Sequence, residues 1–228
     1  RVVLADTNEL SPGVAQHLGL PVLPNVRIAV DAVRDRHHRL SDTLLAVPEG
    51  GFWVLGGLAE VGQWAEIKPA EVAGVIDELA EGCEVVVIQA APVVEDLAGY
   101  GGPDRFGITR RLLADADRVV GVAAATPAGV AQLASWMADV RVVASDTPID
   151  LALTRAPADR FRRGELTERL QADLAPASIT LLPADPRLAR AVWDGALVRR
   201  GPFRKAMDEL AQAIVPAPSR GRTGRHRG

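Results

Sequence analysis

Short runs of apolar residues recur along the chain, and stretches with helical spacing separate them. The runs lie at about 1–5, 52–55, 84–89, 118–124, 150–154 and 178–182, and they are rich in Val, Leu, Ile and Ala. An unbroken β-branched run such as 85–88 is typical of a strand that is covered on both faces. Because strands that alternate with helices usually pair in parallel, the pattern predicts an α/β fold with a mostly parallel sheet and helices on both faces.

Helical signals fill the intervals between these runs. Val72, Val75 and Leu79 fall on one face of a helix predicted over 69–81. Pro127 at a first helical position predicts a helix that runs to about residue 137. Further helices are predicted at 11–18, where a Ser-Pro pair gives the start signal, and at 105–116, 165–173, 186–194 and 202–214. Residues 1–215 are therefore interpreted as one α/β domain.

The last residues, 216–228, differ from the rest in composition. They are rich in Pro, Ser, Gly and Arg, which predicts a disordered basic tail. Such a tail is either a solvated terminus or a contact for nucleic acid or an anionic surface, and we favour the solvated terminus.

Composition and charge narrow the class of protein. A net charge of −3 over 228 residues gives no overall attraction to nucleic acid or to a membrane surface. The single cysteine, Cys83, excludes a disulfide framework within the chain and favours a reducing, cytoplasmic environment. No apolar stretch is long enough to span a bilayer, and no signal peptide is visible.

Several conspicuous residues have ordinary structural interpretations. His37 and His38 lie among charged residues at a spacing that suits a solvated loop better than a metal site. An exposed basic turn is predicted at 160–163. The tryptophans are expected to be packing anchors: Trp53, Trp64, Trp136 and Trp193.

Polar side chains and prolines follow four of the predicted strands. In an open parallel sheet, ligands bind beyond the carboxyl ends of the strands, so these positions are the candidate site. They are Asp6, Asn8, Gln89, Thr154, Arg155, Pro183 and Asp185. The carboxylate of Asp6 could orient water or lie near a metal, or it could cap the following turn. Asp185, which precedes a proline, could likewise be part of an ordinary strand-to-helix turn.

The order of these motifs resembles that of the MinD/ParA group of P-loop ATPases. Residues 2–8, followed by a Leu-Gly pair, are similar to a strand of that family that ends in Asp-x-Asp. The resemblance implies a catalytic position for Asp6, near the attacking water and Mg²⁺, and places Asn8 at the second acidic position. Residues 84–89 are similar to the Walker B strand, with Gln89 at the position of the Asp that holds Mg²⁺. A neutral amide is a poorer Mg²⁺ ligand than a carboxylate.

Two later motifs extend the resemblance toward the adenine. Thr154 and Arg155 match an Asn-Arg pair whose Asn reads the adenine edge, with Thr replacing Asn. Pro183 and Asp185 match a Pro-x-Asp segment that borders the adenine. The Gln-Trp pattern at 63–69 looks closest to the actinobacterial MinD-like or pilus-assembly branch. The resemblance covers roughly residues 1–214.

The resemblance implies a protein that binds ATP and Mg²⁺ and forms a homodimer around them. Such proteins position division, chromosome-partitioning or pilus-assembly machinery. A degenerate member that serves as a non-hydrolysing binding or scaffold module is the alternative, and a Rossmann-like enzyme is disfavoured because no Gly-x-Gly-x-x-Gly turn is present. The substitutions at positions 8, 89 and 154 leave open whether hydrolysis is retained.

The phosphate-binding loop is not in this sequence. No Gly-x-x-x-x-Gly-Lys-Ser/Thr pattern occurs in the 228 residues. The chain opens at Arg1 directly into an apolar strand, so we expect a fragment whose upstream segment carries that loop. Without the loop's backbone N–H groups and its lysine, nothing offsets the charge of a triphosphate. We therefore expect residues 1–228 alone to bind ATP weakly or not at all.

Overall fold

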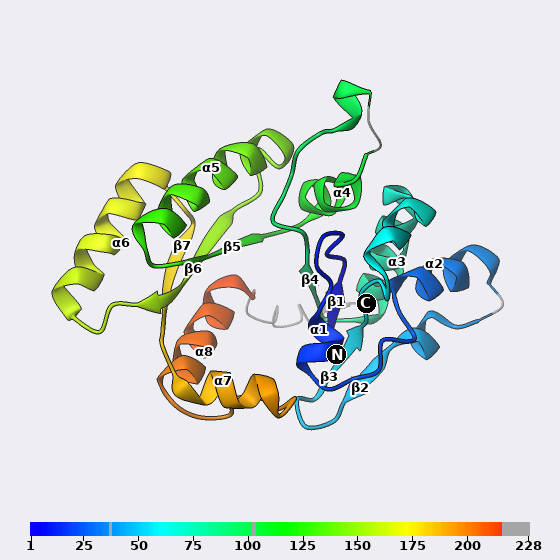
Figure 1. Cartoon of the computed structure of the whole chain (residues 1–228), viewed down its shortest axis with the longest axis horizontal. Coiled ribbons are helices and arrows are strands. Elements are labelled where there is room, and N and C mark those ends of the chain that lie inside the picture. Colours follow the sequence, from blue (N-terminus) through cyan, green and yellow to red (C-terminus); the bar gives the residue numbers. More distant parts are fainter. Residues whose placement is uncertain (37, 102–103, 216–228) are drawn as a thin grey trace, which may run out of the picture.

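The computed structural model describes residues 1–36, 38–101 and 104–215 (Figure 1). His37 and the tail predicted at 216–228 lie outside the described residues. Among those residues, no helix is both long enough and apolar enough to cross a membrane.

Two sheets form the centre of the molecule. The first has the strand order β2-β3-β1-β4, and the second has the order β5-β6-β7. Every pair is parallel except β2 with β3. The bounds are β1 Val2–Asp6, β2 Leu45–Val47, β3 Phe52–Leu55, β4 Val85–Gln89, β5 Val119–Ala124, β6 Ile149–Ala156 and β7 Ser178–Pro183. The predicted α/β class with mostly parallel pairing is confirmed, although the strands form two hydrogen-bonded sheets rather than one.

Helices cover these sheets unequally. The α-helices are α1 Val14–His17, α2 Val26–Asp35, α3 Pro69–Gly82, α4 Gly107–Asp115, α5 Pro127–Val143, α6 Arg160–Leu174, α7 Pro186–Trp193 and α8 Pro202–Ile214. Short 3-10 helices occur at Leu40–Thr43, Val61–Glu66 and Ala98–Tyr100. Helices α2, α3 and α4 share a hydrophobic core with β1 and β3, and α5 and α6 share a second core with β5 and β6. Helix α8 packs on the opposite face of the second sheet, against Ala152 and Leu182.

Helix α4 joins the two halves. It contributes Ile108 and Leu112 to the first core and Leu113 to the second. It also contacts α5, so α4 and α5 belong to one helical layer. The position of the second sheet relative to the first therefore depends in part on this short helix.

Three local features differ from the sequence analysis. Helix α2 was not predicted, and it begins where the side chain of Asn25 accepts a hydrogen bond from the Ile28 N–H at 3.2 Å. Helix α1 starts at Val14 rather than at the Ser-Pro pair. The basic residues at 160–163 are exposed as predicted, but they form the first turn of α6, because Asp159 caps that helix by accepting from the Phe161 N–H at 2.9 Å.

The tryptophans divide into two groups. Trp53 and Trp64 pack against the first core and Trp136 against the second, as expected of anchors. Trp193 is 90% exposed at the end of α7, so its interpretation as a packing anchor was wrong. The single cysteine, Cys83, is partly buried at the end of α3 and packs against the first core.

Candidate functional site

Asp6 ends β1 with a fully buried carboxylate. One oxygen accepts hydrogen bonds from the N–H groups of Gly13 at 2.8 Å and Val14 at 3.0 Å, and the other accepts from the Asn8 N–H at 3.2 Å. Gly57 lies against it so closely that an added Cβ would be 2.7 Å from the Asp6 carboxyl carbon. The arrangement matches the turn-capping alternative that the sequence left open.

Asn8 and Gln89 lie beside Asp6 at the same end of the sheet. The Asn8 side chain accepts from the N–H groups of Leu10 and Ser11, both at 3.0 Å, and so folds the loop after β1. Register places Asp6 directly beside Gln89 on β4. The Gln89 carbonyl accepts from both the N–H and the hydroxyl of Thr7, at 2.9 and 3.1 Å. The structure therefore brings the first three predicted site residues together.

Glu9 was missed by the sequence reasoning. It is 1% exposed, and its carboxylate accepts from the N–H groups of Ile108 and Thr109, both at 3.1 Å, and from the Thr109 hydroxyl at 2.6 Å. Burial raises the pKa of Glu9 above its ordinary value, these hydrogen bonds oppose that rise, and the nearby charge of Asp104 adds to it. Nothing local in the sequence signals this role, because the partners are about 100 residues away.

The Thr109 hydroxyl extends this contact to a third segment. It accepts a hydrogen bond from the Ala91 N–H at 3.1 Å, just beyond the end of β4. Glu9 and Thr109 thus hold together the loops after β1 and β4 and the start of α4. Both residues are buried, so water competes little for these hydrogen bonds.

The second sheet brings together the later candidates. The Thr154 hydroxyl donates to the Ala123 carbonyl at 3.2 Å. Arg155 adopts a left-handed conformation, with φ of 55°, in an irregularity of the β6–β7 pairing. Just past it, Ala156 pairs with Pro183. Thr154, Arg155 and Pro183 therefore lie at one end of two adjacent strands.

Asp185 begins α7, with Pro186 at the first helical position. Its carboxylate accepts from the Arg187 N–H at 3.0 Å and lies 3.3 Å from the Arg187 guanidinium. This is the strand-to-helix turn that the sequence left open for Asp185. A ligand role for this residue stays a prediction.

The two groups of candidates follow strands of different sheets, but the helices after them meet. An added Cβ on Gly195, after α7, would lie 3.2 Å from the backbone N of Gly19, after α1. The Arg199 guanidinium also donates to the Glu49 carbonyl at 2.6 Å. The first contact connects the segments that follow α1 and α7, and the second connects the segment after α7 to the turn between β2 and β3.

The described residues alone lack the ligands that Mg²⁺ and a triphosphate require. The carboxylate of Asp6 is occupied by three backbone N–H groups, and Gln89 is neutral. Within the described part of the chain, no group of three or more His, Cys, Asp or Glu side chains could hold a metal ion. The full sequence contains no phosphate loop. These residues therefore do not form a complete Mg²⁺–triphosphate site by themselves.

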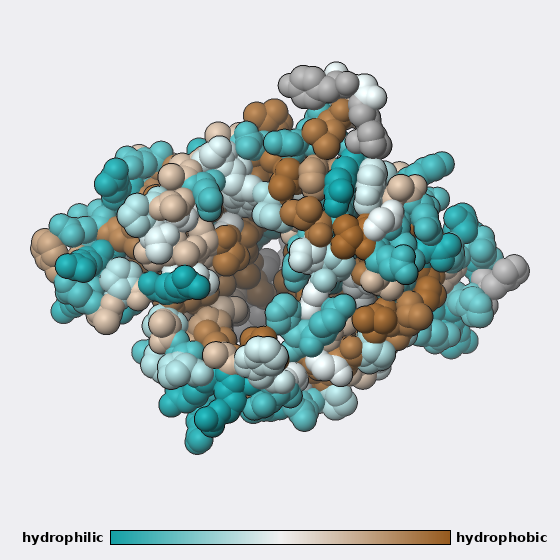
Figure 2. All heavy atoms as spheres, in the orientation of Figure 1, coloured by the Kyte–Doolittle hydropathy of each residue, from teal (hydrophilic) through white to brown (hydrophobic). Residues whose placement is uncertain are grey.

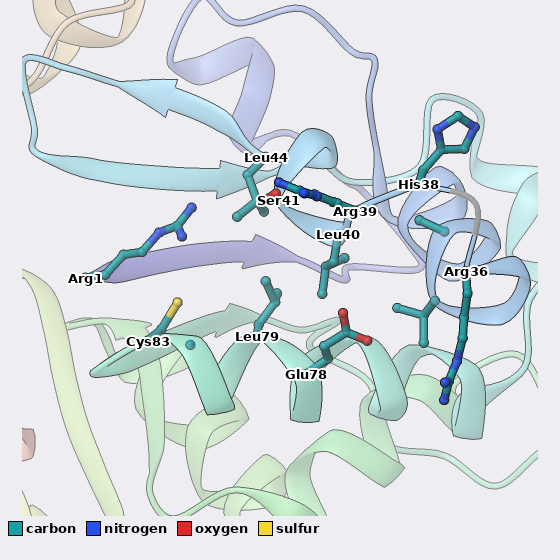
Figure 3. A pocket seen from close by; sticks show the side chains of 13 residues that line it. Arg1, Arg36, His38, Arg39, Leu40, Ser41, Leu44, Glu78, Leu79 and Cys83 are labelled. Atoms are coloured by element: carbon teal, nitrogen blue, oxygen red, sulfur yellow. The ribbon is translucent and has the colours of Figure 1, made fainter.

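A cavity of about 550 Å³ lies at the other end of β1, away from Asp6 (Figure 3). Leu40, Leu44 and Leu79 converge in it, and Arg1 and Glu78 lie near its edge. His38 and Cys83 line it, but none of the seven candidate site residues at the strand ends does.

Several solved structures share this arrangement of sheets and helices. A ParA family ATPase from Chlorobium tepidum superposes with a TM-score of 0.71 over 93% of this chain and 84% of its own, at 14% identity. The chain has the ParA/MinD fold. A putative plasmid partition protein from Borrelia burgdorferi bound to AMPPNP gives 0.66 over 93% and 85%, also at 14% identity. The septum site-determining protein MinD from Pyrococcus horikoshii, complexed with Mg-ADP, gives 0.61 over 94% and 79%, again at 14% identity.

The similarity of this chain to known proteins lies in its fold. No protein-family model matches the sequence, and no curated protein matches it. The candidate residues are thus placed in a fold whose solved examples include nucleotide-bound structures, while their roles stay predictions.

Proposed function

We propose that this chain belongs to a ParA/MinD-type protein that positions cellular machinery through nucleotide-dependent dimerisation. The observation that carries the proposal is the ParA/MinD fold over 93% of the chain, with the polar residues selected from sequence at the carboxyl ends of its strands. Division, chromosome partitioning and pilus assembly are the processes to consider. The names of the neighbours, which include plasmid partition and septum-site proteins, support the first two.

We propose that the two groups of candidate residues contact different parts of the nucleotide. Asp6, Asn8 and Gln89 lie on the first sheet and are proposed to face the phosphates. Thr154, Arg155, Pro183 and Asp185 lie on the second and are proposed to border the base. A phosphate loop and its lysine are required in addition, so residues 1–228 alone are expected to bind Mg-ATP weakly or not at all.

A non-hydrolysing scaffold is the second candidate. Two observations favour it: the Asp6 carboxylate already accepts hydrogen bonds from three backbone N–H groups, and the side chain of Gln89 carries no charge to attract a hard cation. In this case the protein would bind a partner without hydrolysing ATP.

Mg-ATP binding, turnover and dimerisation of the complete gene product test the proposal. Asp6→Ala is compared with Asp159→Ala, which also removes a capping carboxylate but does so at the start of α6. Turnover that is lost in Asp6→Ala and kept in Asp159→Ala supports the ATPase. Stable partner binding without turnover in the wild type supports the scaffold. A wild type with neither nucleotide binding nor dimerisation refutes the proposed switch.

A further inference from the structure

The cavity at the start of β1 has no part in the proposed function. Its volume of about 550 Å³ is typical of pockets that hold small molecules. Three elements meet around it: the end of α2, the 3-10 helix Leu40–Thr43 and the end of α3. Because it lies at the opposite end of β1 from Asp6, a ligand in it would be remote from the candidate nucleotide residues (Figure 3).

Leucines form the floor of this cavity. Leu40, Leu44 and Leu79 converge in it and are 7%, 8% and 5% exposed. A surface that inserts into a bilayer projects its apolar side chains outward, whereas these three are recessed. The floor is therefore suited to the apolar part of a single small molecule rather than to a membrane.

The rim of the cavity is positively charged. Arg1, Arg36 and Arg39 line it, and Glu78 is the one acid among its described lining residues. Arg34, nearby on α2, is held by two aspartates. Within the described part of the chain, by contrast, no ion pair joins the guanidinium of a rim arginine to a carboxylate. The rim therefore attracts anions, although the chain as a whole carries a net charge of −3.

Arg39 joins the charged rim to the apolar floor. Figure 3 shows its side chain extending toward Ser41 and Leu44, whereas the ring of His38 points away from the leucines. The Arg39 side chain is exposed, so its N–H groups are open to a ligand. A guanidinium presents these donors in a planar fork that matches two oxygens of a carboxylate or a phosphate.

We propose that this cavity binds a small organic anion with an apolar body. Its carboxylate or phosphate lies on Arg39 at the rim, and its body lies on the leucines. Figure 2 shows hydrophobic side chains next to hydrophilic ones at the end of the molecule that carries α2 and β2. A bare anion leaves the leucines uncovered, and a neutral hydrocarbon leaves the guanidinium unpaired. The ligand therefore needs both parts.

The single cysteine provides a readout of occupancy. Cys83 lines the cavity beside Leu79, and the 228 residues contain no other cysteine, so a thiol reagent modifies one site per chain. A ligand in the cavity blocks the approach of iodoacetamide to the sulfur. Because this reagent is neutral, changes of charge at the rim do not alter its own attraction to the site.

Four probes separate the two parts of the ligand. Octanoate and octyl phosphate combine an oxyanion with an alkyl body, octanol has the body alone, and inorganic phosphate has the oxyanion alone. At about 1 mM, octanoate or octyl phosphate should slow alkylation of Cys83 about tenfold, as a Kd of about 0.1 mM implies. The comparison of these two identifies the head group. Octanol and inorganic phosphate should each slow alkylation less than about twofold. Protection by neither amphipathic anion, or equal protection by octanol, overturns the inference.

A pair of variants tests the position of the anion. Arg39→Gln removes the rim charge, and Arg163→Gln removes the charge of another exposed arginine, on α6. Both should keep the thermal midpoint of the wild type, because both side chains are exposed. Arg39→Gln should weaken binding of the protecting anion about tenfold or more, and Arg163→Gln should leave it unchanged. Equal protection of Cys83 in the two variants overturns the inference. The assay contains no nucleotide, so its result is independent of the proposed function.

Discussion

Removal of the Glu9 carboxylate tests whether this buried group holds the loop after β1 to α4. In Glu9→Ala, the N–H groups of Ile108 and Thr109 and the Thr109 hydroxyl lose their acceptor. A buried donor left without a partner costs about 1–3 kcal/mol, and water or rearrangement recovers part of that. We therefore expect the free energy of unfolding to fall by on the order of 3 kcal/mol, or about 1 M in the urea midpoint. Glu168→Ala, at an exposed position of α6, should change it by less than about 0.5 kcal/mol.

The pH dependence of the same site gives an independent test. Because the folded state raises the pKa of Glu9 above its ordinary value of 4.5, the folded protein binds this proton more tightly than the unfolded chain does. The contribution of Glu9 to stability is therefore fully present below about pH 4.5 and is lost as the pH rises through the folded pKa. Glu9→Gln does not titrate, so the stability of wild type minus that of Glu9→Gln should decrease across this window.

Urea titrations at several pH values measure both effects. Two results would refute the reasoning. One is a Glu9→Ala variant that loses no more stability than Glu168→Ala. The other is a difference between wild type and Glu9→Gln that stays flat, or increases, as the pH rises from 4.5.

Three further substitutions probe contacts away from Glu9. Arg118→Met should lower the free energy of unfolding by about 3 kcal/mol. The fully buried Asp150 now accepts two guanidinium bonds at 2.9 Å, and the substitution leaves this charge with only the Ser178 hydroxyl as a hydrogen-bond donor; an unchanged thermal midpoint would contradict this. Gly57→Ala should lower the free energy of unfolding by about 1–3 kcal/mol, since its Cβ would lie only 2.6 Å from Pro12. A crystal structure of the variant in which the loop around Pro12 has not moved would contradict this explanation. Trp193→Ala should change the free energy of unfolding by less than about 0.5 kcal/mol, and a larger loss would restore Trp193 as a packing anchor.

Much of the fold was predictable because its signals are local. All six predicted strands are present, and helix starts that depend on a proline, at Pro69, Pro127 and Pro186, were placed correctly. Helix α2 was missed although Val26, Ala29 and Val30, which lie in the first core, have helical spacing. Its helical state depends on packing against α3 and on the cap at Asn25.

The candidate site was predictable only as a set of positions. The strand ends carrying Asp6 and Gln89, and those carrying Thr154 and Pro183, follow from counting strands, and the register places each pair together. The direction in which each side chain points does not follow from that count. The Asp6 carboxylate turns into its own loop, and Glu9, which the sequence did not single out, reaches α4.

The sequence alone determined the order of strands and helices, the parallel class and the positions of the polar strand ends, because hydrophobic periodicity and proline positions act over a few residues. Only the tertiary structure decided that the strands of the described residues form two hydrogen-bonded sheets rather than one, and that Glu9 is buried against α4. These features depend on contacts between residues far apart in the chain, such as Glu9 with Thr109. Local spacing carries no information about such contacts.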